Sequence, residues 1–129
     1  MIVGIGTDII SVARIERVIE RNSEFVHKVF SASEIAYCDA RAAKAQSYAA
    51  RFAAKEAVMK ALGTGWAEGV NWLDIQVVMN EAGKPSLNLS GKALALSESM
   101  QVDRLHLSLS HEKEQAVAFV ILESSRLRP

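Results

Sequence analysis

The stretch that most restricts how this chain can fold is Arg51–Gly65, RFAAKEAVMKALGTG, which closes an Ala-rich run. Its spacing predicts one long helix over Ala42–Leu62, ended by Gly63-Thr64-Gly65. Small side chains recur along one side of this helix, at Ala50, Ala54, Ala57 and Ala61. Because the helix is apolar on nearly every side, we expect it at the centre of the domain, with another backbone close to the alanine row.

Two charged residues, Glu56 and Lys60, lie one turn apart at the edge of the apolar stripe of this helix. Burying a charge without a partner is costly, so each needs one. A metal ion would suit Glu56, and a phosphate would suit Lys60. The alternative is an ordinary Glu–Lys helix pair, which the spacing alone favours. Lys55, next to Glu56, has two interpretations as well, either structural or phosphate-binding.

The Ile- and Val-rich segment Met1–Ile10 reads as a β-strand. Alternation places Ile2, Gly4, Gly6 and Asp8 on one face. Glycines in a strand mark a close approach of another backbone or a ligand. We therefore expect the alanine row to pack over the two glycines and leave Asp8 at the rim. Asp8 could alternatively end the strand or cap the next helix.

Charge is segregated on the next predicted helix, which begins after the N-cap Ser11 and runs to about Glu24. One face carries basic residues and another carries acidic ones: Arg14, Arg17 and Arg21, then Glu16, Glu20 and Glu24. Such segregation is either solvated surface or a docking face for an acidic partner helix.

The remaining pattern predicts short elements in the order of an α+β domain. They are a short irregular or helical link at Phe25–Phe30, a capping box at Ser31–Glu34 opening a helix to Cys38, a strand Leu73–Met79, a turn Asn80–Pro85, a strand Ser86–Leu89, a helix after Ser90 to about Met100, a strand around Leu105–Leu109, its hairpin partner Gln115–Leu122, and a frayed end Ser124–Pro129. We expect one domain, residues 1–129, with an antiparallel β-sheet and the long central helix packed on it.

Composition excludes several classes of function. Half of the residues are hydrophobic, so the chain is globular. The formal net charge is zero and no basic run occurs, which argues against nucleic-acid binding. The single cysteine, Cys38, rules out an internal disulfide and suits a reducing compartment. Without a signal-peptide pattern or a long apolar run, we expect a soluble cytoplasmic protein and no membrane partner.

The candidate chemistry follows from two carboxylates on separate elements. Asp8 on a strand and Glu56 on a helix suffice to hold Mg²⁺, which binds through one or two carboxylates together with substrate phosphates. Lys60 can neutralise charge on the same phosphates, and the Gly-Thr-Gly turn leaves room for a ligand. The Walker pattern is absent. These residues therefore indicate Mg²⁺-dependent phosphate chemistry.

The same segments resemble the bacterial holo-acyl-carrier-protein synthases along essentially the whole chain. The likeness rests on Gly4-Ile5-Gly6-Thr7-Asp8-Ile9, on Arg51–Ala57 with Lys60 and Gly63-Thr64-Gly65, on Gly83-Lys84-Pro85, and on Leu107–His111. The resemblance implies a 4′-phosphopantetheinyl transferase fold. It also implies transfer of the 4′-phosphopantetheine of coenzyme A to a serine of apo-acyl carrier protein, releasing adenosine 3′,5′-bisphosphate for fatty acid biosynthesis.

By the same resemblance, Asp8 and Glu56 bind Mg²⁺, and Lys60 stabilises or protonates the leaving phosphate. Coenzyme A is expected to contact a larger set: Arg51, Lys60, Gly63, Thr64, Pro85, Ser110 and His111. Arg14 and Arg21 match positions that meet the carrier protein, and the family is usually a homotrimer with sites between subunits. The proton acceptor is left open between Glu56, Asp8 through a metal-bound water, and a free water.

Two other functions fit parts of the pattern. A non-catalytic oligomeric module could bind an acidic partner through the face of Arg14, Arg17 and Arg21, and it would need neither carboxylate. Another Mg²⁺-dependent enzyme could act on nucleotides without a carrier protein. Without the resemblance, His111 would read as an ordinary turn residue.

Overall fold

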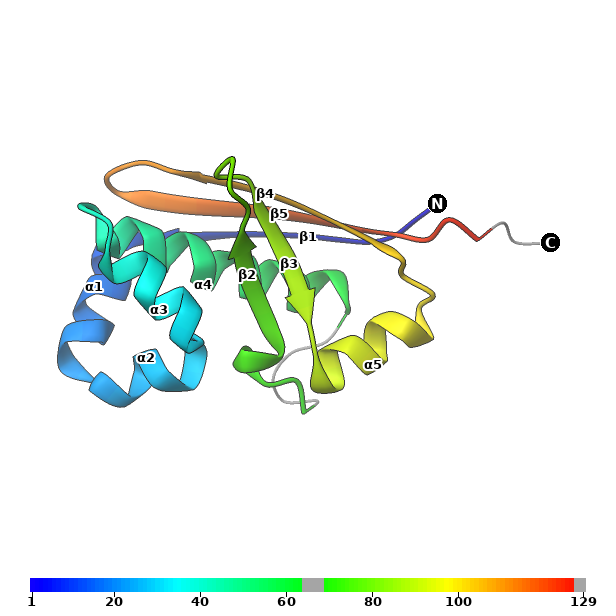
Figure 1. Ribbon diagram of the computed structural model, residues 1–129, viewed down its shortest axis with the longest axis horizontal. Helices are drawn as coiled ribbons and strands as arrows, with labels where there is room; N and C mark the ends of the chain where they lie inside the picture. Colours follow the sequence, from blue (N-terminus) through cyan, green and yellow to red (C-terminus); the bar gives the residue numbers. More distant parts are fainter. Residues whose placement is uncertain (64–68, 127–129) are drawn as a thin grey trace.

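The computed structural model describes residues 1–63 and 69–126 as an α+β fold (Figure 1). Its larger sheet is antiparallel, in the order β1 (Ile2–Ser11), β5 (Gln115–Glu123) and β4 (Arg104–His111). A separate hairpin pairs β2 (Ile75–Met79) with β3 (Pro85–Leu89). The predicted fold class is confirmed. The strands nevertheless form two sheets, because β3 packs beside β4 without joining its hydrogen-bond ladder.

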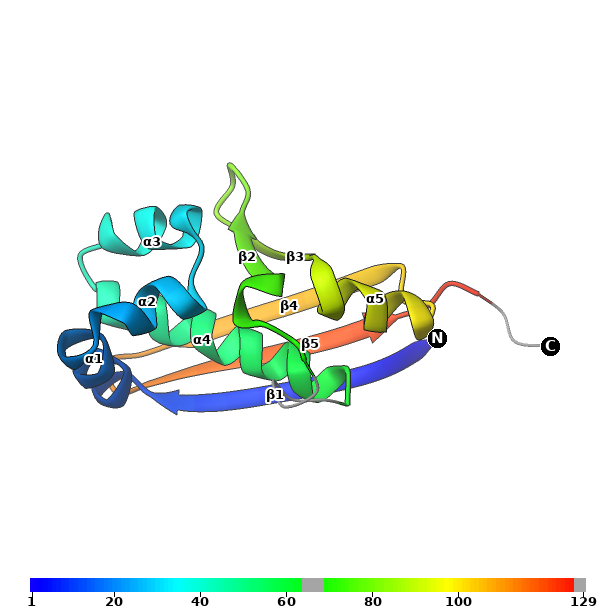
Figure 2. The same ribbon diagram turned by 90° about the horizontal axis from the view of Figure 1, so that it is seen from below.

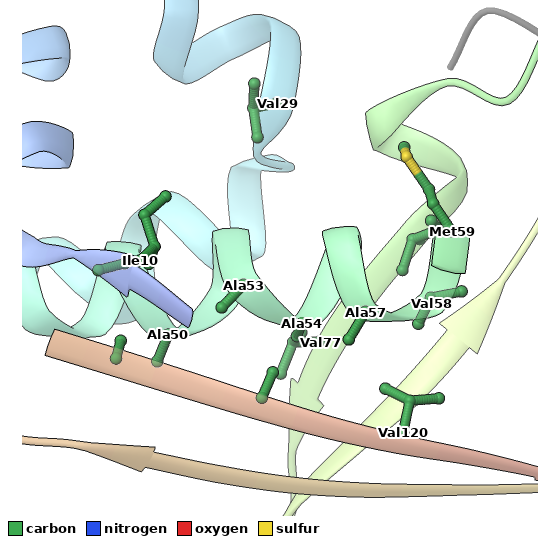
Figure 3. Close-up of a cluster of buried hydrophobic side chains, with 14 of the residues drawn as sticks. Ile10, Val29, Ala50, Ala53, Ala54, Ala57, Val58, Met59, Val77 and Val120 are labelled. Atoms are coloured by element: carbon green, nitrogen blue, oxygen red, sulfur yellow. The ribbon is translucent and has the colours of Figure 1, made fainter. Parts of the chain in front are cut away.

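The long helix α4 (Lys44–Ala61) lies along one face of the larger sheet, with the smaller helices and the hairpin around it (Figures 1 and 2). Figure 3 shows Ala50, Ala54 and Ala57 on the side of α4 that faces β5, and Val120 of β5 pointing toward the helix. The helix is central, as its composition predicts. It begins two residues later than expected, after an N-cap position, Ala43, that has no side-chain cap.

The predicted contact between alanines and glycines is confirmed. A Cβ atom added to Gly6 would collide with the carbonyl of Ala57, and one added to Gly4 would collide with the carbonyl of Ala61. These glycines therefore set how closely α4 approaches β1. A bulge that the alternation did not predict lies between Ile2 and Gly4 in the pairing with β5, and Ile2 is 55% exposed.

The charged helix is shorter than predicted. Helix α1 (Val12–Arg21) is capped by Ser11, whose Oγ accepts the amide N–H of Arg14 at 3.3 Å. Asn22 then turns extended and caps α2 (Ser23–Val29), accepting the amide N–H of Glu24 at 3.1 Å. The residues expected as a link are therefore mostly helical, and Glu24 belongs to α2 instead of the acidic face of α1.

The remaining elements follow the prediction with shifted ends. Helix α3 (Ala32–Asp39) opens with the expected capping box. The turn η2 (Trp72–Asp74) replaces the start of the expected second strand, because the side chain of Asn71 caps a short 3₁₀ helix there. Pro85, expected in a turn, begins β3. Helix α5 (Gly91–Ser99) starts after Ser90 as predicted, but the Ser90 side chain makes no capping hydrogen bond.

Ser124 begins the predicted frayed end, but hydrogen bonds hold this residue in place. Its amide donates to the Met1 carbonyl at 2.8 Å, and its own carbonyl accepts from the Met1 amine at 2.6 Å, so Ser124 is buried. Cys38 is also buried. In the ranges that the structure describes, no helix is both long and apolar enough to span a bilayer.

Candidate active site

A cavity of about 440 Å³ brings the three predicted catalytic residues together, between β1, α1, α2 and α4. Asp8, Glu56 and Lys60 line one part of it, and Arg14 of α1 lines another. Its remaining lining is largely apolar: Ile9, Ile10, Ile15, Val18, Phe25 and Phe52. Nothing in the sequence pattern indicated the contribution of α2, because Phe25 was expected in a link.

The close packing of α4 on β1 is what joins the two carboxylates. Glu56 directly precedes Ala57, whose carbonyl lies against Gly6, and Asp8 follows Gly6 on the same strand face. A side chain at Gly6 would push the helix off the strand and separate Asp8 from Glu56. The predicted pairing of strand and helix carboxylates is therefore produced by backbone contact.

Lys60 bridges the same two elements. Its Nζ donates to the Thr7 carbonyl at 3.0 Å and to Asp8 Oδ1 at 3.1 Å. The Lys60 side chain is 55% exposed, and that of Asp8 is 16% exposed. The ammonium group thus lies at the mouth of the cavity, within reach of solvent and of a bound anion. Its predicted contact with a phosphate stays a prediction.

Glu56 is half-buried and its carboxyl has a raised pKa. Burial is the larger cause, the negative charge of Asp8 adds to it, and Lys60 opposes it. Two carboxylates that repel each other in a partly enclosed site favour a cation between them. Within the described ranges, no group of three His, Cys, Asp or Glu side chains could hold a metal ion. Two carboxylates with room for phosphates fit Mg²⁺, which completes its shell with water and substrate oxygens.

Arg51 lies away from this cavity's lining and is 4% exposed. Its guanidinium stacks 4.1 Å from the ring centre of Tyr37, and its Nη1 donates to the Ser47 carbonyl at 3.1 Å. Arg51 Nε is buried and finds no hydrogen-bond partner in the part of the chain described. The predicted contact of Arg51 with coenzyme A stays a prediction.

Other predicted coenzyme A contacts are distributed around the chain. His111 and Ser110 are exposed at the end of β4, and His111 Nδ1 lies 2.9 Å from Gln46 Oε1. Gln46 also lines a second cavity, of about 470 Å³, with Lys44 and Lys113. Sequence reasoning missed these two lysines, although two cations at one cavity suit a phosphate.

The remaining predicted contacts lie elsewhere. Pro85 begins β3 on the separate hairpin, and Gly63 follows α4 with a φ of 74°, in the left-handed region. Thr64 lies outside the described residues. Of the two arginines predicted to meet a carrier protein, Arg14 lines the cavity, while Arg21 is exposed at the end of α1.

Lys55 has a structural role, which was one of its two interpretations. Its side chain is fully buried and pairs with Glu34 Oε1 at 2.9 Å. Burial lowers the pKa of the Lys55 ammonium, and the charge of Glu34 partly offsets that effect. No pattern in the sequence connected Glu34 with Lys55, because the capping box already accounted for the glutamate.

Comparisons with known proteins agree on one family. A family model described as the 4′-phosphopantetheinyl transferase superfamily matches residues 4–120. A holo-[acyl-carrier-protein] synthase from an Anaeromyxobacter species is 51% identical, over 97% of this chain and 98% of that protein.

Solved structures point the same way. A holo-(acyl-carrier-protein) synthase from Bacillus anthracis, in complex with CoA (3′,5′-ADP), is 41% identical with a TM-score of 0.80, covering 97% of this chain and 99% of that chain. The Helicobacter pylori synthase in complex with coenzyme A is 33% identical with a TM-score of 0.80, covering 92% of this chain and 99% of the other.

Proposed function

The chain belongs to the 4′-phosphopantetheinyl transferase superfamily, among its holo-[acyl-carrier-protein] synthases, and we propose that it transfers 4′-phosphopantetheine from coenzyme A to a serine of apo-acyl carrier protein. The products are holo-acyl carrier protein and adenosine 3′,5′-bisphosphate. The observation that carries this proposal is the meeting of Asp8, Glu56 and Lys60 in one cavity. Relatives that hold coenzyme A support the choice of donor.

In the proposed reaction, the serine oxygen bonds to the β-phosphorus of coenzyme A, and the bond from that phosphorus to the adenosine-side phosphate oxygen breaks. Asp8 and Glu56 would hold Mg²⁺, which neutralises charge on the pyrophosphate. Lys60 keeps its hydrogen bond to the Thr7 carbonyl and turns its remaining protons to the leaving phosphate. A charge placed where negative charge develops stabilises the transition state.

The serine must also lose its proton. The candidate acceptors are Glu56, Asp8 through a metal-bound water, and a free water.

We assign docking of the carrier protein to Arg14 and Arg21 on α1. Both are exposed, and Arg14 lies at the cavity where the serine must arrive. Arg14→Glu should raise the apparent KM for the carrier about tenfold and change the KM for coenzyme A much less. Steady-state kinetics with each substrate varied in turn would measure this. Equal effects on both constants would contradict the assignment.

The proposed assembly is a homotrimer with sites between subunits. The outer face of the larger sheet exposes Ile5 at 57%, Ile9 at 58% and Phe119 at 42%, an apolar surface that a second copy would cover. Coenzyme A would then contact Arg51, Pro85, Ser110 and His111 from more than one chain, together with Lys60, Gly63 and Thr64. Such an assembly would account for the separation of Ser110 and His111 on β4 from Lys60 on α4 and Pro85 on β3 within one chain.

The decisive test mixes the protein with coenzyme A, Mg²⁺ and apo-acyl carrier protein and weighs the carrier by mass spectrometry. We expect the added mass of phosphopantetheine, its loss with a chelator, and its restoration by Mg²⁺. A carrier of unchanged mass, where a reference synthase modifies it, would refute the activity. We place the reaction in the cytoplasm, in support of fatty acid biosynthesis, which complementation of a synthase-deficient bacterium would test.

A further inference from the structure

The buried lysine beside the candidate metal ligand has every proton engaged. Lys55 Nζ donates to Glu34 Oε1 at 2.9 Å, to the Trp72 carbonyl at 3.2 Å and to the Ile75 carbonyl. An ammonium group has three protons, so these contacts use all of them. Lys55 therefore has no proton left for a ligand, and its contacts lie on η2, on β2 and on α3.

Glu34 is equally constrained. Its Oε1 accepts the amide N–H of Ser31 at 2.9 Å, and its Oε2 accepts the amide N–H of Val77 at 2.9 Å. The carboxylate is 1% exposed. The pair is thus a junction at which α3, α4, η2 and β2 are held by directional bonds instead of by apolar contact alone.

This junction lies next to Glu56 in the sequence and on the other side of α4 from β1. Three consecutive residues of α4 make different contacts. Lys55 donates a hydrogen bond to the hairpin, and Ala57 packs against Gly6 of β1. Glu56 stands between these two contacts. A helix held from both sides at one turn has little freedom to rotate about its axis, and such a rotation would swing Glu56 away from Asp8.

We propose that Lys55, through Glu34 and the carbonyls of Trp72 and Ile75, is a positioning residue that sets the direction in which Glu56 faces Asp8. The inference rests on the proposed function and adds a residue that touches neither coenzyme A nor the metal. Stability alone does not call for such a pair, because a buried ion pair can be replaced by neutral groups of similar size without loss of stability. Geometry does call for it, since a displacement of about 1 Å in a catalytic group can lower the rate about 10²-fold.

The test separates positioning from folding with three variants. Lys55→Met leaves Glu34 charged and buried, whereas Glu34→Gln combined with Lys55→Met removes both charges. Val29→Ala, at a buried position of α2, is the control for general destabilisation. Each variant is measured for its Tm, for kcat and KM with coenzyme A, and for Mn²⁺ affinity at saturating coenzyme A.

We expect the double variant to recover much of the Tm that Lys55→Met loses, and yet to show kcat at least about tenfold below wild type and weakened Mn²⁺ binding, with KM for coenzyme A nearly unchanged. Val29→Ala should lower the Tm and leave kcat and Mn²⁺ affinity as in wild type. If Lys55→Met does not fold, the double variant decides, together with Glu34→Gln, which keeps both backbone acceptors of Lys55.

A double variant with wild-type kcat and Mn²⁺ affinity would overturn the inference and leave Lys55 a purely structural residue. A wild-type protein that transfers nothing to the carrier would instead refute the proposed function, and the inference with it. The two failures are distinguishable, because the first occurs only when the wild-type protein is active.

Discussion

Two lysines of α4 each pair with a carboxylate from another element, and the two pairs differ in nearly everything else. Lys55 meets Glu34 at 2.9 Å with both side chains fully buried, while Lys60 meets Asp8 at 3.1 Å with the lysine 55% exposed. The buried pair also makes hydrogen bonds to two further elements, η2 and β2. The exposed pair keeps protons and lone pairs free for a ligand.

Pairing chemistry alone therefore does not distinguish a structural ion pair from a functional one. Breaking a fully buried pair leaves an uncompensated charge in the interior, which costs about 3–5 kcal/mol. Breaking a solvent-exposed pair costs about 0–1 kcal/mol. The Lys55 pair can therefore serve the fold, whereas the Lys60 pair can exchange partners at little cost when a phosphate arrives.

The largest expected effect concerns the stability of the buried pair. Lys55→Met should lower the free energy of unfolding by about 3–5 kcal/mol, because Glu34 is left charged without its counter-ion. Urea denaturation followed by circular dichroism would measure it, with Lys60→Met as the matched control, expected to change stability by less than about 1 kcal/mol. Equal losses of unfolding free energy in both variants would show that the two ion pairs contribute equally to stability.

For the rate of turnover, the larger loss is expected at the Lys60–Asp8 pair. Lys60→Met should lower kcat about 10²-fold or more, because the leaving phosphate loses a proton donor and a positive charge. The protein should remain folded with an unchanged circular dichroism spectrum. Transfer to apo-acyl carrier protein, counted by mass spectrometry over time, would measure the loss. A folded Lys60→Met variant with wild-type turnover would place Lys60 outside the chemistry.

The smallest expected effect concerns the charge of Glu56, which lies between Lys55 and Lys60 in the sequence. Its pKa in the folded chain is raised above the ordinary value of 4.5, so the folded state binds this proton more tightly than the unfolded state does. Stability from this group is present below the ordinary pKa and is lost as the pH rises through the folded pKa. Above that window, Glu56→Gln should be more stable than wild type by at most about 1 kcal/mol, because solvent screens a half-exposed carboxyl.

Thermal or urea unfolding of Glu56→Gln and wild type across this pH range would check the sign. The advantage of the variant should vanish below the ordinary pKa, where both side chains are neutral. An advantage that persisted in acid would attribute the effect to packing instead of charge.

The sequence pattern predicted a structural feature correctly where the residues that cause it are neighbours in the chain. Ser11 and Ser31 cap their helices as predicted, because a cap needs only a side chain and an amide within one turn. The contact of Gly4 and Gly6 with the alanine row was also predictable, since only small residues allow that approach. The break at Asn22 was missed although its cap is equally local, and the bulge between Ile2 and Gly4 depends on the pairing of β1 with the distant strand β5.

Residue pattern alone therefore specifies a central helix, a glycine-bearing strand beneath it, and two carboxylates able to meet at their contact. It pointed Lys60 to a phosphate and left Lys55 with two interpretations, structural or phosphate-binding. Only the tertiary structure decided between them, by enclosing Lys55 among α3, η2 and β2 and leaving Lys60 at a cavity mouth. The cause is burial, which residue spacing does not reveal. An ammonium group in the interior is held by its hydrogen-bond partners, whereas one in contact with water is available to bind a ligand.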